Sequence, residues 1–322
     1  MSQKIPDNHP LEGHKYTVIT PQIVGFQKMV EFLIEFSLPG MIGYGPARVG
    51  KTTSINAVTQ MISEKYRGQI AIMETIIDTH RKGENRLFFE EFCRNLGLEW
   101  HVKRPSGSEL RSLVIEYMIM EGRKNGNKVL LIVDEASKMV VEDYDYMMDV
   151  YNRLEKNGVS LICVLVGTEK LLETKKEMSW NVESQVVGRF MVNEFEFSPV
   201  KDIEELRQIL NGFDTHIKYD GRSLTEDLFP ESFKEGKRLG DEAESIEKAI
   251  VTIKRERASE KKRLGITKGG GINMNQMIQM QYLIMTIEMI MKKQGRYSGK
   301  EKWPTEKDWL ETLKLSGFPH AI

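Results

Sequence analysis

An eight-residue, glycine-containing segment constrains the fold of this 322-residue chain more than any other feature. It matches the pattern Gly-x-x-x-x-Gly-Lys-Ser/Thr in full and reads Gly45-Pro46-Ala47-Arg48-Val49-Gly50-Lys51-Thr52. A short apolar run precedes it and a helix-like stretch follows, which is the context that a phosphate-binding loop requires. In such a loop the backbone amides point at phosphate oxygens, and the start of the helix adds positive potential. The segment therefore predicts a strand, a phosphate site and a helix in direct succession.

The side chains of this loop have specific expected roles. The Lys51 ammonium should reach the outer phosphates, and the Thr52 hydroxyl should bind magnesium. A glycine-rich turn without a ligand is the alternative. A dinucleotide-binding fingerprint is rejected, because Arg48 stands where that pattern needs its third glycine. The predicted nucleotide-binding set is Gly45, Pro46, Ala47, Arg48, Val49, Gly50, Lys51, Thr52, Thr53 and Asp134.

Short apolar runs alternate with helical stretches through the first two thirds of the chain. This rhythm predicts an α/β fold with a parallel sheet. The middle runs are apolar almost throughout, as expected of strands that helices cover on both faces. The last run alternates Phe195 and Phe197 with Glu194 and Glu196, which suits an edge strand. The expected strands are residues 40–44, 69–77, 128–133, 159–166 and 191–197, after a first helix at 21–36.

Two carboxylates, Asp134 and Glu135, end the third of these runs. Asp134 at the end of a buried strand would hold the magnesium shell, and Glu135 would orient and deprotonate an attacking water. The pair favours hydrolysis and argues against a P-loop small-molecule kinase, which passes the phosphate to a substrate hydroxyl. In the alternative interpretation both residues only cap the next helix.

With both motifs in place, the chain resembles an AAA+ ATPase. Two further segments narrow the family: Val164-Leu165-Val166-Gly167-Thr168-Glu169-Lys170-Leu171 and Val187-Gly188-Arg189-Phe190. They are similar to segments of the TnsC/TniB ATPases that regulate transposition. The resemblance extends over residues 18–200 and implies a P-loop AAA+ domain with a parallel five-stranded sheet and a C-terminal helical lid domain. It also implies ATP and Mg²⁺ as cofactors and assembly as a ring or filament on double-stranded DNA. The implied partners are a transposase and a TniQ/TnsD-type target selector.

The resemblance assigns catalytic roles to two further residues beside Lys51 and Glu135. Thr168 matches the polar sensor that contacts the γ-phosphate or the lytic water, and Arg189 matches the arginine finger that reaches a neighbouring subunit's nucleotide. Without the resemblance, Thr168 could be a turn residue and Arg189 an ordinary surface arginine. One position departs from the family, because Met274 stands at the sensor-arginine position of the lid. This loss is consistent with a slow ATPase.

Two basic segments align with the loops through which the family tracks the DNA backbone. The first runs from Thr79 to Phe88 and the second from Lys103 to Ser106. Arginine and lysine give salt-dependent attraction to phosphates, while hydroxyls and amides at helix starts position the backbone without reading bases. Solvated loop charges are the alternative. The expected DNA contacts are Lys82, Arg86, Lys103, Arg104 and Ser106.

Length and composition agree with a soluble globular protein of about two domains, at roughly 150 residues per domain. Hydrophobic residues make up 40% and charged residues 29% of the chain, and the formal net charge is −1. No apolar run approaches the ~20 residues of a membrane span, so a cytoplasmic location is expected. The expected parts are an N-terminal extension (1–22), the AAA+ domain (23–199), a helical lid domain with a charged insertion (200–300) and a C-terminal tail (301–322).

Two C-terminal features allow more than one interpretation. The basic stretch 254–268 could touch DNA or a partner, or it could be a solvated helix face. The tail, with Trp303 and Trp309, could dock on a neighbouring subunit or a transposition partner, or it could pack on its own helical domain.

The sequence thus predicts an ATP-dependent oligomeric regulator of transposition that binds target DNA and is released by hydrolysis. Three rivals remain. A replication-initiator or helicase-loader ATPase shares the fold, a non-hydrolysing scaffold shares the nucleotide site, and a small-molecule kinase shares the loop.

Overall fold

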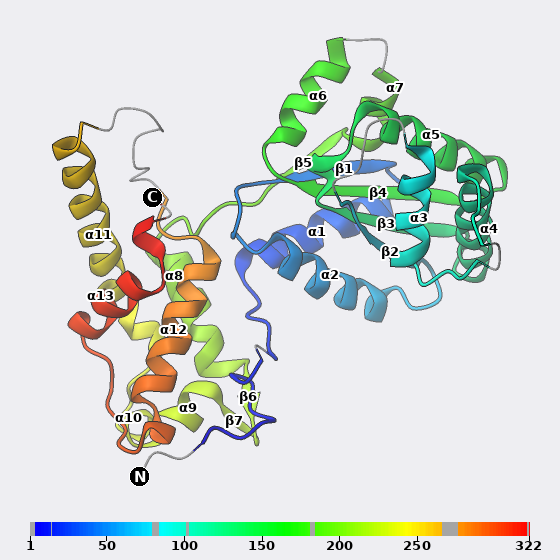
Figure 1. Ribbon diagram of the computed structural model, residues 1–322. Coiled ribbons are helices and arrows are strands. Elements are labelled where there is room, and N and C mark those ends of the chain that lie inside the picture. The colour runs from blue at the N-terminus through cyan, green and yellow to red at the C-terminus, as the bar shows by residue number, and fades with distance from the viewer. Residues whose placement is uncertain are drawn as a thin grey trace. The chain divides into compact units, whose positions relative to one another are not determined.

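The computed structural model describes residues 4–13, 15–78, 84–100, 103–180, 184–265, 276–320 and 322. The chain divides into two compact units (Figure 1). The nucleotide-motif unit contains residues 25–47 and 51–197. The helical unit contains residues 1–24, 48–50 and 198–322. Among the described residues, no helix has both the length and the apolar character that crossing a membrane demands.

The nucleotide-motif unit is built on a five-stranded parallel sheet, as the alternating pattern predicts. Along the sheet the strands are β2 (Ala71–Ile76), β3 (Lys128–Asp134), β4 (Ser160–Gly167), β1 (Gly40–Tyr44) and β5 (Asn193–Glu196). The short, alternating β5 lies at an edge, as its pattern indicates. Tyr44 pairs with Gly167 and Ile76 with Asp134, so the carboxyl ends of these strands meet at one edge of the sheet.

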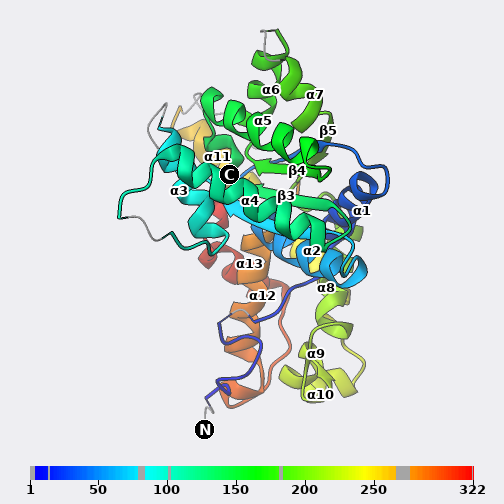
Figure 2. The same ribbon diagram turned by 90° about the vertical axis from the view of Figure 1, so that its right-hand side faces the viewer.

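Helices cover both faces of this sheet (Figures 1 and 2). One face carries α1 (Pro21–Glu35) and α2 (Lys51–Lys65). Phe26 of α1 stacks on Phe195 and Phe197, with ring centroids 5.4 and 5.0 Å away. The other face carries α3 (Asn85–Asn95), α4 (Gly107–Lys124) and α5 (Val141–Lys156), and the unit also contains η1 (Ala136–Lys138), α6 (Lys170–Trp180) and α7 (Ser184–Phe190).

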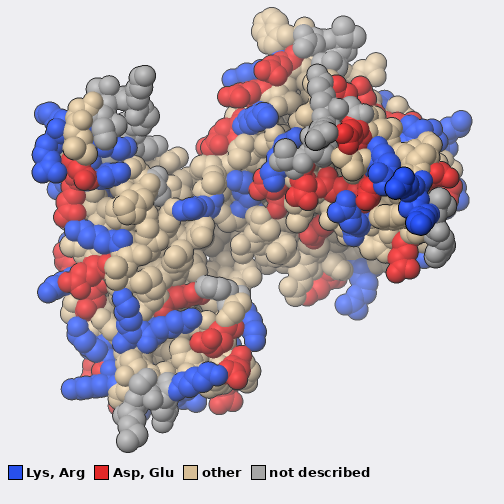
Figure 3. Space-filling model, viewed as in Figure 1, with Lys and Arg blue, Asp and Glu red and all other residues tan. Residues whose placement is uncertain are grey.

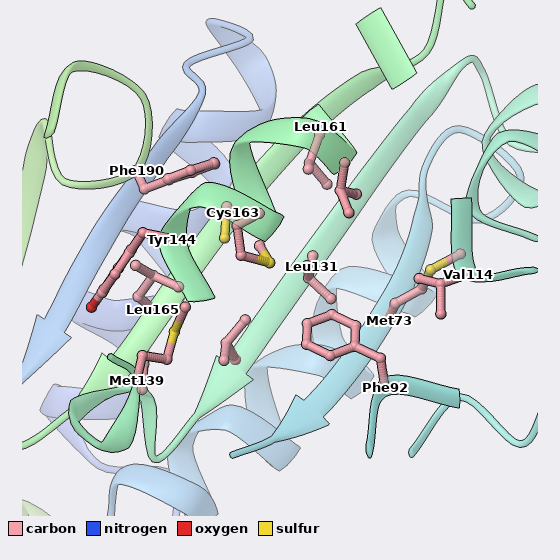
Figure 4. Close-up of a cluster of buried hydrophobic side chains, with 14 of the residues drawn as sticks. Met73, Phe92, Val114, Leu131, Met139, Tyr144, Leu161, Cys163, Leu165 and Phe190 are labelled. Atoms are coloured by element: carbon pink, nitrogen blue, oxygen red, sulfur yellow. The ribbon is translucent and has the colours of Figure 1, made fainter. Parts of the chain in front are cut away.

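The core under α3, α4 and α5 is formed by alternate residues of the middle strands (Figure 4). Leu131 of β3 and Cys163 of β4 meet Phe92 of α3 and Tyr144 of α5 there. Both cysteines of the chain are free and buried, and burial raises the pKa of the Cys163 thiol. Burial of apolar side chains in this continuous core stabilises the packing of α3, α4 and α5 on the sheet.

The helical unit brings the two ends of the chain together. Its core combines Leu11 and Val18 with residues from the C-terminal helices. Its elements are α8 (Ile203–Thr215), β6 (Lys218–Tyr219), β7 (Arg222–Ser223), α9 (Leu224–Leu228), α10 (Pro230–Lys234), η2 (Leu239–Glu242), α11 (Ala243–Arg263), α12 (Met280–Gln294), η3 (Arg296–Ser298), α13 (Glu306–Leu315) and η4 (Phe318–His320).

The C-terminal tail packs on its own helical unit, which decides between the two interpretations of that segment. Trp309 is fully buried, and its indole N–H donates to Glu242 Oε2 at 3.0 Å. The Trp303 indole donates to Oε1 of the same carboxylate at 2.8 Å. Both tryptophans are therefore used inside the unit.

Residues 254–265 are the described part of the basic stretch 254–268, and most of them belong to α11. Their side chains differ in burial. Lys254 is buried, its ammonium donates to the Gln276 carbonyl, and burial lowers its pKa. Lys261, Lys262 and Arg263 occupy the last turn of α11, where cations interact favourably with the helix C-terminus. Figure 3 shows Lys and Arg side chains gathered around that end of the helix.

Candidate functional site

The phosphate-binding loop follows β1 and leads into α2. The chain approaches so closely at Gly45 that a Cβ atom there would lie 2.0 Å from the Phe197 carbonyl oxygen, so only glycine fits. Gly50 has φ +97°, a conformation that favours glycine. Arg48 also has a positive φ, +69°. Within the helical unit, its guanidinium donates to the Tyr282 hydroxyl.

The Lys51 ammonium turns back over the loop. It donates to the carbonyl oxygens of Gly45 at 2.9 Å and Pro46 at 2.8 Å. Burial lowers its pKa, and the carboxylates of Glu135, Glu169 and Asp134 oppose that shift. The cation therefore lies in a local field of acidic groups, where a bound polyphosphate would compete for it.

Thr52 and Asp134 join the two sequence motifs. The Thr52 hydroxyl donates to Asp134 Oδ2 at 2.7 Å across a separation of 82 residues. Asp134 is 6% exposed, and its Oδ1 accepts the backbone N–H of Glu135 at 2.8 Å. A hydroxyl and a carboxylate are hard oxygen donors of the kind that Mg²⁺ binds together with substrate phosphates. These residues fit the predicted magnesium site.

Glu135 stands directly after this carboxylate in a left-handed conformation, with φ +56°. Its side chain is 43% exposed, and Oε2 lies 3.6 Å from the Lys138 ammonium. A positive φ is uncommon for a residue other than glycine, and such conformations gather at active sites. The backbone here holds an accessible carboxylate beside Asp134.

Thr168 follows β4, the neighbour of β3 in the sheet, and it contacts Ser137 of η1. The Ser137 hydroxyl oxygen accepts the Thr168 backbone N–H at 2.5 Å and lies 3.1 Å from Thr168 Oγ1. Ser137 is not among the residues that the sequence motifs select. Its place two residues after Glu135 is visible in the sequence, but its contact with Thr168 depends on the pairing of β3 with β4.

Arg189 lies on α7 and packs against α5. Its guanidinium is 4.6 Å from the centre of the Tyr151 ring and donates to the Asn152 side chain. These contacts hold the cation on the outer side of α5. The role in a neighbouring subunit's site stays a prediction.

The described parts of the two basic segments expected to bind DNA, residues 84–88 and 103–106, contact each other in the nucleotide-motif unit. Arg86 Nε donates to the Pro105 carbonyl at 3.1 Å, and Arg86 also pairs with Glu90 at 3.1 Å. Lys103 and Arg104 are exposed. Lys82 lies outside the described residues, as does Met274 of the lid.

Ser106 is the N-cap of α4. Its oxygen accepts the Glu109 N–H at 3.3 Å, and the Glu109 carboxylate accepts the Ser106 N–H at 2.7 Å. This reciprocal pair is a capping box. The Ser106 hydroxyl therefore already has a structural partner, and the helix start beside Lys103 and Arg104 is rigid.

The fold and these motifs together define a P-loop AAA+ architecture. Residues 40–175 match the family model described as an AAA domain. Among curated proteins, none matches the chain in sequence. The structure of the Aeropyrum pernix ORC2 protein with ADPNP and ADP aligns at a TM-score of 0.54 and 13% identity, over 96% of this chain and 71% of that one. Its ADP form aligns at 0.54 and 13%, over 94% and 70%. At this identity the likeness concerns the fold.

Proposed function

We propose that this protein is an ATP-dependent oligomeric regulator of DNA transposition that assembles on double-stranded target DNA. It would link a TniQ/TnsD-type target selector to the transposase, and hydrolysis would release it. One observation supports ATP binding and hydrolysis: the hydrogen bond from the Thr52 hydroxyl to Asp134 brings the phosphate loop and the acidic end of β3 together. The transposition part rests on the similarity of the Thr168 and Arg189 segments to TnsC/TniB ATPases.

The proposed reaction is hydrolysis of ATP to ADP and phosphate. Glu135 accepts a proton from water as the water oxygen attacks the γ-phosphorus, and the bond to the β-phosphate bridging oxygen breaks. Lys51 stabilises charge on the outer phosphates. Thr52 and Asp134 would hold Mg²⁺, which supplies charge neutralisation on the phosphates when bound. A neighbour's Arg189 would stabilise the charge that develops during transfer.

The first experiment tests the base. Glu135→Gln keeps the shape of the side chain and removes its basicity, so turnover should fall by about 10²- to 10⁴-fold. Binding of a fluorescent ATP analogue should be retained. Glu116→Gln, on the exposed side of α4, is the matched control and should leave both quantities unchanged. Unchanged turnover in Glu135→Gln would refute the assignment.

The second experiment tests assembly. Sedimentation and electron microscopy would compare wild type with Lys51→Ala, with and without duplex DNA, ATP and a slowly hydrolysed analogue. Rings or filaments that need both nucleotide and DNA, and that Lys51→Ala loses, support the proposal. Monomers under every condition would contradict it and favour the kinase or scaffold alternatives.

The third experiment tests the DNA surface formed by Lys103 and Arg104. Replacing both by alanine should lower the slope of log affinity against log salt by about 1.8, at ~0.9 per phosphate contact. Arg123→Ala with Lys124→Ala removes the same charge at the other end of α4 and serves as control. An equal loss of slope in both double variants would exclude a specific surface.

A replication-initiator or helicase-loader role is the second candidate. The observation in its favour is the fold-level likeness to the Aeropyrum pernix ORC2 protein. Co-purification separates the two, because a transposase should accompany a transposition regulator and a helicase should accompany a loader.

A further inference from the structure

The short turn η1 connects Glu135 and Thr168, the two residues that the proposed hydrolysis uses at the ends of the neighbouring strands β3 and β4. Glu135 precedes the turn, and its carbonyl oxygen accepts the Lys138 N–H at 2.9 Å. Thr168 follows β4 and touches the middle of the turn through Ser137. Glu135 and Thr168 are therefore joined through only two intervening residues, Ala136 and Ser137.

The contact between Ser137 and Thr168 is tightly packed. Ser137 is 9% exposed, and Thr168 is partly buried. A Cβ atom at Gly167 would lie 2.1 Å from the Ser137 hydroxyl oxygen and 2.8 Å from the Ser137 backbone nitrogen. The glycine lets the end of β4 rest directly on the turn. Because Ser137 is nearly buried and the backbone of Gly167 lies against it, the Ser137 side chain has little room to turn away.

The hydrogen bonds between Ser137 and Thr168 determine which atoms of the Thr168 hydroxyl remain available. The Ser137 oxygen accepts the Thr168 N–H at 2.5 Å and the Thr168 hydroxyl hydrogen at 3.1 Å. The Ser137 hydrogen points to the Thr168 carbonyl oxygen at 3.4 Å. A hydroxyl has one hydrogen to donate and two lone pairs that accept. With its hydrogen directed to Ser137, Thr168 Oγ1 faces other partners as an acceptor.

We infer that Ser137 is a positioning residue for the hydrolysis proposed above, and that it acts through Thr168. It fixes Thr168 Oγ1 as an acceptor for one hydrogen of the attacking water. Glu135 takes the other hydrogen as the water oxygen bonds to the γ-phosphorus and ADP leaves. The inference rests on the proposed ATPase function.

Lys138, also on the turn, contacts Glu135 through an ion pair. Both of those side chains are well exposed, at 38% and 43%. Exposed ion pairs hold a geometry weakly, since water competes for both charges. The buried Ser137 contact is the one that can fix an orientation.

The test is a double-mutant cycle on steady-state hydrolysis with Ser137→Ala, Thr168→Val and the double variant. Misplacing a reacting group by about 1 Å can cost about 10²-fold in rate, so Ser137→Ala should lower kcat by about 10- to 100-fold. The KM and the dissociation constant for a slowly hydrolysed ATP analogue should stay within about twofold of wild type. The double variant should be no slower than Thr168→Val, because groups acting as one unit are not additive.

Two further variants separate positioning from folding. Thr168→Ser keeps the hydroxyl and should retain most of the rate, yet it should remain sensitive to Ser137→Ala. Ser160→Ala, at the start of β4, is the matched control and should leave kcat unchanged. Ser137→Cys keeps a similar volume with only a weak acceptor, and it carries the same comparison if Ser137→Ala does not fold.

The outcomes distinguish this inference from the function on which it rests. Multiplicative losses in the double variant would overturn it, as would a fall in analogue binding and in the melting temperature that parallels the fall in kcat. If Glu135→Gln abolishes turnover while Ser137→Ala does not change it, the inference alone fails. If Glu135→Gln leaves turnover intact, the proposed role of Glu135 as the base fails, and the hydrolysis mechanism on which this inference rests fails with it.

Discussion

The two units of this protein use charged side chains in opposite ways. In the nucleotide-motif unit, Lys51 and Glu135 are only partly covered, and the Lys51 ammonium bonds to loop carbonyls that a phosphate could replace. In the helical unit, Asp227 is fully buried and its partners enclose it. The difference separates charges that remain accessible to solvent from charges that are enclosed by the fold.

The network around Asp227 joins residues from both ends of the helical unit's sequence. Leu11 N–H donates to His9 Nδ1 at 3.2 Å, so the ring hydrogen is on Nε2 and points to Asp227 Oδ2 at 3.3 Å. Arg296 donates to Asp227 Oδ1 at 2.6 Å. Tyr16 adds a second link, donating to Glu288 at 2.6 Å, and burial with the nearby carboxylate raises its pKa. The N-terminal residues are thereby fixed to the C-terminal helices.

The largest expected effect concerns Arg189. An arginine finger contributes about 10³- to 10⁵-fold to the rate, so Arg189→Ala should nearly abolish hydrolysis while nucleotide affinity and melting temperature stay unchanged. Mixing Arg189→Ala with Glu135→Gln should restore about a quarter of the wild-type rate, because one site in four would combine both intact groups across a head-to-tail interface. A mixture as inactive as its components would show that Arg189 does not act in trans.

The next effect is on stability and falls in the helical unit. Asp227→Ala leaves His9 and Arg296 without their shared carboxylate partner. This substitution should lower the free energy of unfolding by about 3 kcal/mol. Affinity for the ATP analogue should not change. The control Glu231→Ala removes an exposed carboxylate that pairs with Lys234 and should cost under about 1 kcal/mol. Weaker nucleotide binding in Asp227→Ala would break the distinction between the two units.

The smallest expected effect is on the free energy of unfolding and concerns the start of α13. It makes the stability of the helical unit depend on pH. Burial raises the pKa of Asp308, but hydrogen bonds from Thr305 and the Lys302 ammonium outweigh it and lower the pKa to about 2. A depressed carboxyl pKa stabilises the fold above its unfolded value, near 4, and this contribution is lost as pH falls towards 2. Thr305→Ala should cost about 1 kcal/mol.

Chemical unfolding at pH 6 and pH 3 provides the measurement for this last prediction. The difference between wild type and Asp308→Asn should shrink at the lower pH. Lys307→Ala, on the exposed side of the same helix, should show no such change beyond its own small effect. A constant difference across this range would mean that Asp308 keeps an ordinary pKa.

Much of the nucleotide-motif unit was predictable because its signals are local. Each of the five strands coincides with one of the five apolar runs to within two residues at each end, and β3 and β4 extend one residue beyond theirs. The edge position of β5 agrees with the alternation of Phe195 with Glu194 and Glu196. The phosphate loop needs particular residues at fixed spacing, since glycine alone fits at Gly45 and the positive φ at Gly50 favours glycine. The contact between Ser137 and Thr168 was not predictable, because strand order had to bring β3 beside β4.

The sequence by itself determined the sheet, the phosphate loop and the acidic strand end, since periodicity and glycine geometry act between near neighbours in the chain. The tertiary structure alone decided where the ends of the chain lie and which charges are enclosed. Trp303 and Trp309 share Glu242, and His9 meets Asp227 across 218 residues. Such pairs form only where buried polar groups must find partners that folding brings close, whatever their separation in the chain.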